Sequence, residues 1–204
     1  MRGALLEEQV VTLRTIWSGE TIKARRPSDG ANFVDRSATS YLMSYDAEMV
    51  GPIGPRVERA GGPELMLGGT EQPALRRVAR YADAYMTGPV PATVPISGSP
   101  DTVVSLYTKV REFAANEGRS APRLVHGTYV ALEASDDEVA ARLRDYYDIG
   151  GKDRYLWPFS RVLRTNDAIR HHLSEMESVG VDECFLWPTI PDFKQIDLIA
   201  TAAL

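Results

Sequence analysis

Residues 63–87, PELMLGGTEQPALRRVARYADAYMT, decide the fold class. A short apolar run at 64–67 ends in two glycines and predicts a buried strand, and Thr70 is placed to cap a helix over 72–81. A second short apolar run at 84–87 predicts another strand. A strand, a helix and a strand in such close succession indicate a βαβ unit with parallel strands. The helix residues predicted to face inward are Leu75, Val78 and Ala79.

The same pattern continues to the end of the chain. Ser99-Pro100-Asp101 predicts a helix start, because serine is a favoured N-cap residue and proline fits the first helical position. Ser135 followed by Glu138 forms a capping box, which predicts another helix start. In chain order, the elements predicted after the βαβ unit are a proline-rich loop at 88–99, a helix at 100–116, a strand at 123–132, a helix opening at the capping box, an irregular segment at 149–160, a helix at 166–179 ended by Gly180, a strand at 183–187 and a terminal helix from Asp192.

Four apolar strands that alternate with helices place the protein in the α/β class, with parallel strands joined by right-handed crossovers. The strand expected at 123–132 is continuously apolar, as strands buried on both faces of a parallel sheet are. Four strands alone leave two exposed sheet edges, which parallel sheets seldom tolerate. Part of the sheet is therefore missing or is supplied by another chain, and we expect a homo-oligomer.

The residues before the βαβ unit follow a different pattern. A helix is expected at 5–17, ended by Gly19, and its broad apolar face requires a docking surface. Residues 20–62 are irregular, and loops of this length within a compact domain are uncommon. We interpret the segment either as a lid or as a sign that part of the domain is absent. The apolar face of the helix contains Leu5, Leu6, Gln9, Val10, Leu13, Ile16 and Trp17.

The composition is that of an ordinary soluble domain, since 44% of the 204 residues are hydrophobic and 25% are charged. No run approaches the roughly 18 apolar residues of a membrane-spanning helix, and Glu7 and Glu8 interrupt any signal-like run at the N-terminus. The single cysteine, Cys184, has no disulfide or metal-ligand partner, which fits a reducing compartment. We expect a cytoplasmic protein, and the net charge of −5 disfavours a nucleic-acid partner.

Four segments resemble the luciferase-like monooxygenase family. Residues 63–69, continued by 73–84, resemble the strand, Gly-Gly turn, helix and Asp-Gly-Trp stretch of that family. Residues 8–19, EQVVTLRTIWSG, resemble the helix that ends in Leu-Trp-Ser/Thr-Gly and follows the fourth barrel strand. Residues 180–183 with the strand after them resemble the eighth strand, and 123–132 lies in the position of the seventh. The order and spacing of these segments carry the likeness, which extends over nearly the whole chain.

The resemblance implies a partial TIM (β/α)8 barrel that retains about four parallel strands with flanking helices, in a fold that usually takes about 250 residues. Residues 1–204 then form a single luciferase-like domain, the C-terminal portion of the barrel. The implied activity is that of a flavin-dependent oxidoreductase or monooxygenase, with FMN or a deazaflavin as cofactor and a small organic substrate. In full-length members the first four strands carry much of the isoalloxazine pocket, the substrate pocket and the dimer contacts. The alternatives are a non-catalytic homologue that binds a flavin phosphate or assembles as a homodimer, and a gene remnant without function.

The turn formed by Gly68, Gly69 and Thr70 is the predicted cofactor-binding site. Glycines let a ligand approach the backbone closely, and the following helix start offers unpaired N–H groups and a positive dipole end, which suit a phosphate. The resemblance implies that this turn grips the phosphate of the flavin or deazaflavin. The alternative is a plain strand-to-helix turn capped by Thr70. No residue is assigned as a catalytic acid, base or nucleophile.

The histidines and the cysteine have structural explanations beside functional ones. His126, in the middle of a predicted strand, faces either the barrel mouth, where it could touch the ligand, or the helices, where it would be a core residue. His171 and His172 are adjacent on a helix and lack the i, i+4 spacing of a helical metal pair, so no metal is expected. Cys184 is expected to be an inert, buried thiol.

Three further groups of residues also have a structural and a functional explanation. The basic cluster of Lys23, Arg25 and Arg26 is a solvated loop, a clamp for an anionic cofactor tail or a contact for nucleic acid, and three basic residues in an acidic chain form no stripe of the kind that nucleic acid requires. The aromatic segment with Tyr155, Trp157, Pro158 and Phe159 either packs against a barrel end or lines a substrate cavity. The carboxylates of Asp136, Asp137 and Glu138 are expected to stabilise the first turn of a helix rather than to form an acid/base pair.

Overall fold

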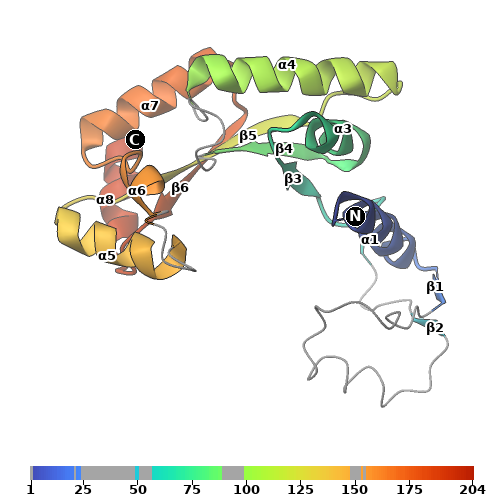
Figure 1. Cartoon of the computed structure of the whole chain (residues 1–204), viewed down its shortest axis with the longest axis horizontal. Helices are drawn as coiled ribbons and strands as arrows, with labels where there is room; N and C mark the ends of the chain where they lie inside the picture. The colour runs from blue at the N-terminus through green and yellow to red at the C-terminus, as the bar shows by residue number, and fades with distance from the viewer. Residues whose placement is uncertain are drawn as a thin grey trace. The chain divides into compact units, whose positions relative to one another are not determined.

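The computed structural model describes residues 2–20, 22–23, 49–50, 57–88, 99–147, 153 and 155–204. They belong to two compact units, Met1–Glu64 and Leu65–Leu204, and each unit is described by itself. Figure 1 shows the elements of both units with their labels.

A four-stranded parallel sheet forms the centre of the second unit (Figure 1). The predicted α/β class with parallel strands is therefore confirmed. A helix lies in each crossover between neighbouring strands. The strands lie side by side in chain order: β3 (Met66–Gly68), β4 (Ala84–Thr87), β5 (Arg123–Val130) and β6 (Glu183–Pro188).

The helices of this unit begin and end close to the predicted residues. The Oγ atom of Ser99 accepts a hydrogen bond from the Thr102 N–H at 3.3 Å, and Ser135 and Glu138 form the reciprocal bonds of the capping box. Gly180, with φ +81°, follows the end of its helix as predicted. The helices are α3 (Gln72–Tyr81), α4 (Pro100–Asn116), α5 (Asp136–Tyr147), α6 (Leu156–Phe159), α7 (Asn166–Ser178) and α8 (Lys194–Ala203).

Two strands differ from their predicted bounds because neighbouring groups take up the backbone hydrogen bonds. The Leu65 N–H donates to the Asp83 carboxylate at 2.9 Å, and the Leu65 carbonyl accepts from the Asp83 and Ala84 N–H groups, so β3 begins only at Met66. The strand predicted to end at residue 132 ends at Val130, because the side chain of Gln195 bonds both the N–H and the carbonyl of Leu132.

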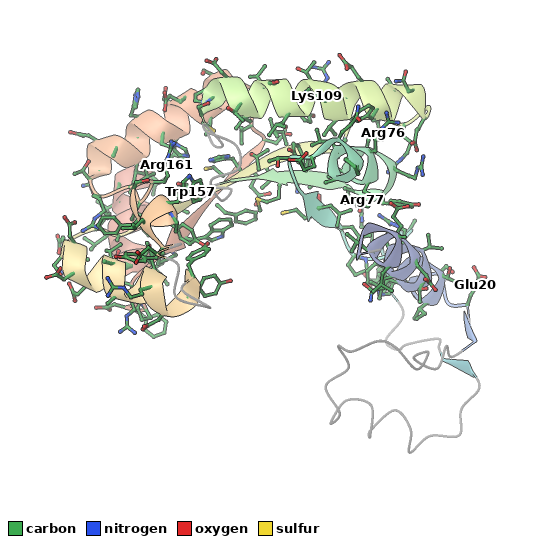
Figure 2. The ribbon with its side chains drawn as sticks, viewed as in Figure 1. Glu20, Arg76, Arg77, Lys109, Trp157 and Arg161 are labelled. Carbon is green, nitrogen blue, oxygen red and sulfur yellow. The ribbon has the colours of Figure 1, made fainter. Side chains whose placement is uncertain are left out.

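One face of the sheet, which we call the helix face, carries two apolar clusters. The first joins α3 and α4 to the first three strands. At its surface, the guanidinium of Arg76, which is labelled in Figure 2, lies 4.7 Å from the ring centre of Phe113. The second joins β5 and β6 to α7 and α8. The predicted inward residues Leu75, Val78 and Ala79 are all buried in the first cluster, as expected.

The opposite face of the sheet, which we call the barrel face, carries the alternate residues of each strand. Leu67, Tyr85 and Leu124 lie in or against the first helix-face cluster, and Leu186 packs against the second. Because side chains alternate along a strand, the residues directly before and after each of these in the same strand point to the barrel face. The residues assigned in this way to the barrel face are Met66, Gly68, Ala84, Met86, Arg123, Val125, Gly127, Tyr129, Glu183, Phe185 and Trp187.

The first unit contains the predicted N-terminal helix, α1 (Arg2–Trp17), which is followed by Gly19 at φ +91°. Of its predicted apolar face, Val10 and Ile16 are buried, whereas Leu5, Leu6 and Leu13 are exposed. A short antiparallel pair joins β1 (Ile22–Lys23) to β2 (Met49–Val50). Arg25, Arg26 and most of the segment predicted to be a long loop lie outside the described residues.

Among the helices that the structure describes, none is long and apolar enough to cross a membrane.

Candidate functional site

The carboxyl ends of the four strands meet at one edge of the sheet, because all four run in the same direction. In barrels of parallel strands, the loops at this end form the active site. The described residues that follow the strands here are Gly69 after β3, Gly88 after β4, Ala131 after β5 and Thr189 after β6.

Gly68 and Gly69 form a tight turn between β3 and α3. Gly69 has φ +134°, and a Cβ atom there would lie 2.5 Å from the Cβ of Ala74. A Cβ at Gly68 would lie 3.0 Å from the Met86 carbonyl oxygen. The buried Tyr85 hydroxyl donates to the Gly69 carbonyl at 2.9 Å, and burial raises the pKa of this phenol. Both glycines therefore let the turn pack closely on its own helix and on β4.

The prediction that Thr70 caps α3 is wrong. The helix begins at Gln72, so the N-cap residue is Glu71, and no side-chain cap hydrogen bond forms there. Pro73 has no N–H group, and the N–H groups of Ala74 and Leu75 both donate to the Glu71 carbonyl. By contrast, serine or threonine hydroxyls accept from the first turns of α4, α5 and α7. The half-buried Thr70 hydroxyl thus lies beside a helix start that lacks a side-chain cap.

His126 lies on the helix face and is only 1% exposed. Its Nδ1 atom is 2.9 Å from the Thr87 Oγ1, and this hydroxyl donates to the Val125 carbonyl at 3.1 Å. The hydroxyl oxygen therefore accepts from Nδ1–H, and we assign the Nδ1–H tautomer on that basis. The ring centre lies 5.1 Å from that of His172 on α7. Burial, reinforced by His172, lowers the pKa of His126 to about 4. The histidine is a core residue under the helices and does not face the barrel mouth.

The other histidines and the cysteine form no chelating group. His172 is half-buried, its pKa is lowered by burial, and its Nε2 atom has no hydrogen-bond partner among the described residues. His171 is exposed and lies 3.5 Å from Glu175. Cys184 lies opposite His126 in the β5–β6 register, and burial raises the pKa of its thiol to about 11, as expected for an inert cysteine. In the described part of the chain, no three potential ligands come together to hold a metal ion.

An aromatic cluster lies on the barrel face near the carboxyl ends of β5 and β6. The ring centres of Tyr129 and Trp187 are 5.5 Å apart. Tyr147, at the end of α5, places its hydroxyl 2.5 Å from that of Tyr129. Burial and this hydrogen bond raise the pKa of Tyr147. This cluster was not predicted from the sequence, although Phe185 and Trp187 repeat with the two-residue period of one strand face.

The predicted aromatic segment at 155–159 packs against the core. Tyr155 and Phe159 lie against the buried cluster under α5, and Pro158 is itself buried. The Arg144 guanidinium lies 4.6 Å from the centre of the Tyr155 ring and donates to its hydroxyl at 2.9 Å. Trp157, labelled in Figure 2, is half-buried in α6. Packing, the first of the two alternatives, is therefore the one that the structure supports.

The first-turn carboxylates of α5 also have structural partners. Glu138 accepts the bonds of the capping box from Ser135, which lower its pKa. Asp136 pairs with Arg164 at 3.1 Å. These contacts agree with the expectation that the acidic cluster stabilises a helix start.

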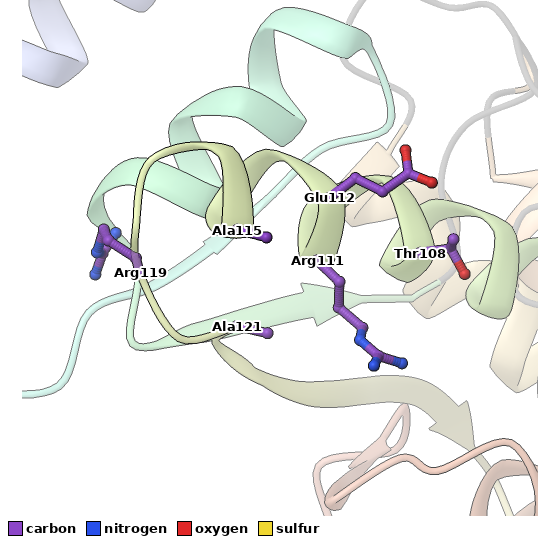
Figure 3. Close-up of a pocket in the computed structure, with 6 residues that line it drawn as sticks. All are labelled: Thr108, Arg111, Glu112, Ala115, Arg119 and Ala121. Atoms are coloured by element: carbon purple, nitrogen blue, oxygen red, sulfur yellow. The ribbon is translucent and has the colours of Figure 1, made fainter.

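A surface pocket of about 560 Å³ lies elsewhere, along α4 and the loop that leads into β5 (Figure 3). One of its side chains, Arg119, donates to the Ala79 carbonyl at 2.6 Å at the end of α3. The loop precedes β5, so the pocket lies at the amino ends of the strands and not at the candidate site. The lining residues are Thr108, Arg111, Glu112, Ala115, Arg119 and Ala121.

Comparison with known proteins identifies the family. The model of the luciferase-like monooxygenase family matches residues 1–181, and the chain belongs to this family. The four-stranded sheet with its flanking helices is accordingly part of a TIM (β/α)8 barrel, as predicted. No curated protein matches the chain.

Solved structures with the same fold share little sequence with the chain. An F420-dependent secondary alcohol dehydrogenase in complex with an F420–acetone adduct has 13% identity and a TM-score of 0.59, over 100% of this chain and 62% of that one. The EDTA monooxygenase EmoA from Chelativorans sp. BNC1 has 12% identity and a TM-score of 0.57, over 99% of this chain and 58% of that one. DmoA from Hyphomicrobium sulfonivorans has 13% identity and a TM-score of 0.56, over 98% of this chain and 54% of that one. The chain thus spans little more than half the length of these proteins.

Proposed function

We propose that the protein is a flavin- or deazaflavin-dependent oxidoreductase of the luciferase-like class that acts on a small organic substrate in the cytoplasm. The family match over residues 1–181 is the observation that carries this proposal. The structural neighbours add support, since their names include an F420-dependent dehydrogenase and a monooxygenase. FMN is our first candidate for the cofactor, and a deazaflavin is the second.

We assign the binding of the cofactor phosphate to Gly68, Gly69 and Thr70. The start of α3 has no side-chain cap, and the helix dipole favours negative charge there. The N–H groups of Ala74 and Leu75 donate to the Glu71 carbonyl, so Gln72 is the first-turn residue whose N–H group we assign to the anion. The Thr70 hydroxyl is adjacent and is not used as the cap. Pro73 has no N–H group to donate, and Glu71 places a carboxylate beside the anion.

The isoalloxazine or deazaisoalloxazine ring supplies the redox chemistry when it is bound, and the protein orients the ring and excludes water from it. The barrel face near the strand ends suits this task, because Tyr129 and Trp187 form an apolar, aromatic surface there. We assign no catalytic acid or base to the described residues. His126 and Cys184 lie on the helix face, and Tyr147, beside the barrel face, has a raised pKa and is hydrogen-bonded to Tyr129.

The test is a titration of the purified chain with FMN and, separately, with a deazaflavin, followed by absorbance and by the melting temperature. We expect saturable binding of one of them and a rise in the melting temperature. If neither ligand binds or stabilises the chain, the proposal is wrong.

Variants of the turn then test the assigned residues. Thr70→Val removes the hydroxyl and keeps the shape, so it should weaken binding without loss of fold. Thr108→Val, on the exposed side of α4, is the matched control and should bind as the parent does. Gly69→Asp should abolish binding, whereas Gly118→Asp, at another left-handed glycine with open space around it, should not. Equal affinity of Thr70→Val and the parent would remove this threonine from the site.

A further inference from the structure

The barrel face of the sheet carries apolar side chains that lie in none of the buried clusters. Met66, Met86, Phe185 and Trp187 are half-buried, and none of the three clusters of described residues includes them. They stand on β3, β4 and β6, so this apolar surface extends across the sheet. Parallel sheets are normally covered on both faces. Among the described residues, the first two clusters lie on the helix face, and the third reaches the barrel face only at Tyr129, near the end of β5.

Both edges of the same sheet are open in the described part of the chain. β3 pairs only with β4, and β6 pairs only with β5. An open edge presents unpaired N–H and carbonyl groups to any strand that can align with it. The short β3 and the longer β6 are therefore both able to accept another strand.

The order of the strands determines which partner closes such a sheet. The strands lie in chain order and all run in one direction, so the two edges are the first strand and the last strand. A second copy related by a two-fold axis along the strands would place its β3 beside β6 of the first copy, in parallel. Its β6 would likewise meet β3 of the first copy. The ring then contains eight parallel strands, the number that closes a TIM barrel around a filled interior.

The charges of the barrel face are compatible with burial in such a ring. Its two charged residues, Arg123 and Glu183, lie side by side at the amino ends of β5 and β6 and pair with each other at 3.1 Å. Apart from this ion pair and the Tyr129 hydroxyl, which is hydrogen-bonded to Tyr147, the facing copy meets an apolar surface. Symmetric dimers are also the commonest oligomers of soluble proteins.

We propose that two copies of this chain associate barrel face to barrel face, with β6 of each beside β3 of the other, and close an eight-stranded parallel barrel. Each Gly68–Thr70 turn then lies next to β6 of the second copy, so the candidate site is complete only in the dimer. This inference rests on the topology of the sheet and not on the identity of the cofactor. The assembly is therefore tested without any ligand.

The first experiment measures the mass of the full chain in solution by light scattering. We expect twice the chain mass of 22.5 kDa. Met86→Lys places a charge on the barrel face and should yield a monomer with unchanged far-ultraviolet circular dichroism. Val104→Lys, at an exposed apolar residue of α4, is the matched control and should remain dimeric. Should Met86→Lys fail to fold, Phe185→Lys tests the same face on another strand.

The second experiment locates the interface by hydrogen exchange. In the dimer, the amides of 66–68 and 183–187 should exchange more slowly than in the Met86→Lys monomer, while those of α4 should not change. A monomeric parent chain would overturn the proposal. So would a dimer that Val104→Lys dissociates and Met86→Lys does not, because such a dimer uses the helices.

Discussion

The indole ring of Trp187 lies over the backbone of Gly127, so that a Cβ atom at position 127 would overlap the ring. Gly127 is buried in the middle of β5, and Trp187 stands on β6 opposite Tyr129, one step further along the barrel face. Because glycine has no Cβ atom, position 127 leaves room for the indole of Trp187. The contact fixes the aromatic cluster at the carboxyl ends of the strands.

We predict that Gly127→Ala destabilises the protein by about 1–3 kcal/mol, the usual cost of overpacking. Urea unfolding measures the loss. The double variant Gly127→Ala/Trp187→Leu should recover most of it, because the smaller side chain frees the space. Strictly additive effects of the two substitutions would show that the contact does not limit packing.

The elements that the sequence predicted best are those controlled by local interactions. Ser99 and Ser135 act within one helical turn, so their hydroxyls could be assigned before any tertiary contact was known. The assignment of Thr70 was wrong because the N-cap residue directly precedes the first helical residue: a helix that begins at Gln72 has Glu71 as its N-cap and Pro73 at its second position, so Thr70 lies one residue too early.

The contacts between strands could not be predicted in the same way, because they depend on register. The face that His126 occupies follows from its pairing with Thr87 and Cys184, which are distant in sequence. The fit of Trp187 over Gly127 likewise requires the β5–β6 alignment. The two-residue alternation along a strand shows which side chains share one face of the sheet. Whether that face is the helix face or the barrel face follows only from how the helices pack on the sheet.

Two aspartates that belong to the family-like segments have a common structural role, which supports a second prediction. Asp83, just before β4, accepts from the Leu65 N–H at 2.9 Å, and Asp182, just before β6, accepts from the Leu124 N–H at 2.7 Å. Each carboxylate therefore bonds to the start of the strand beside it. We expect Asp182→Ala to cost about 1.5–3 kcal/mol, the range for hydrogen bonds to charged groups.

The control for Asp182 is Asp192→Ala, since Asp192 bonds the exposed start of α8 rather than a strand. Chemical unfolding of the three proteins gives the comparison. A loss for Asp182→Ala no larger than for Asp192→Ala would contradict this role.

Gln195 supports a third prediction, because its side chain continues the hydrogen bonding of β5 beyond the last strand residue. The amide is buried, accepts from the Leu132 N–H at 3.0 Å and donates to the Leu132 carbonyl at 2.7 Å. Gln195→Leu leaves both backbone groups without a partner, which costs about 1–3 kcal/mol for each buried group left unpaired. Thermal unfolding should show the loss, and Gln9→Leu, at an exposed position of α1, should change little.

The buried imidazole of His126 makes stability depend on pH. Its pKa is about 4 in the folded chain, against an ordinary value of 6.5. Between these two values the unfolded chain binds a proton that the folded chain does not, so the free energy of unfolding falls as the pH is lowered from 6.5 to 4. Above pH 6.5 both states are neutral at this residue and the contribution is constant. The shift corresponds to a loss of about 3 kcal/mol.

His126→Gln removes this titration and keeps a group that can bond the Thr87 hydroxyl. We expect the variant to be less stable at pH 8, yet to lose less stability than the parent between pH 6.5 and pH 4. His171→Gln, at the exposed neighbour of His172, should follow the parent at every pH. Urea unfolding at a series of pH values gives the free energy of unfolding of all three proteins. If this free energy fell with decreasing pH as steeply in His126→Gln as in the parent, the titrating group would be another residue.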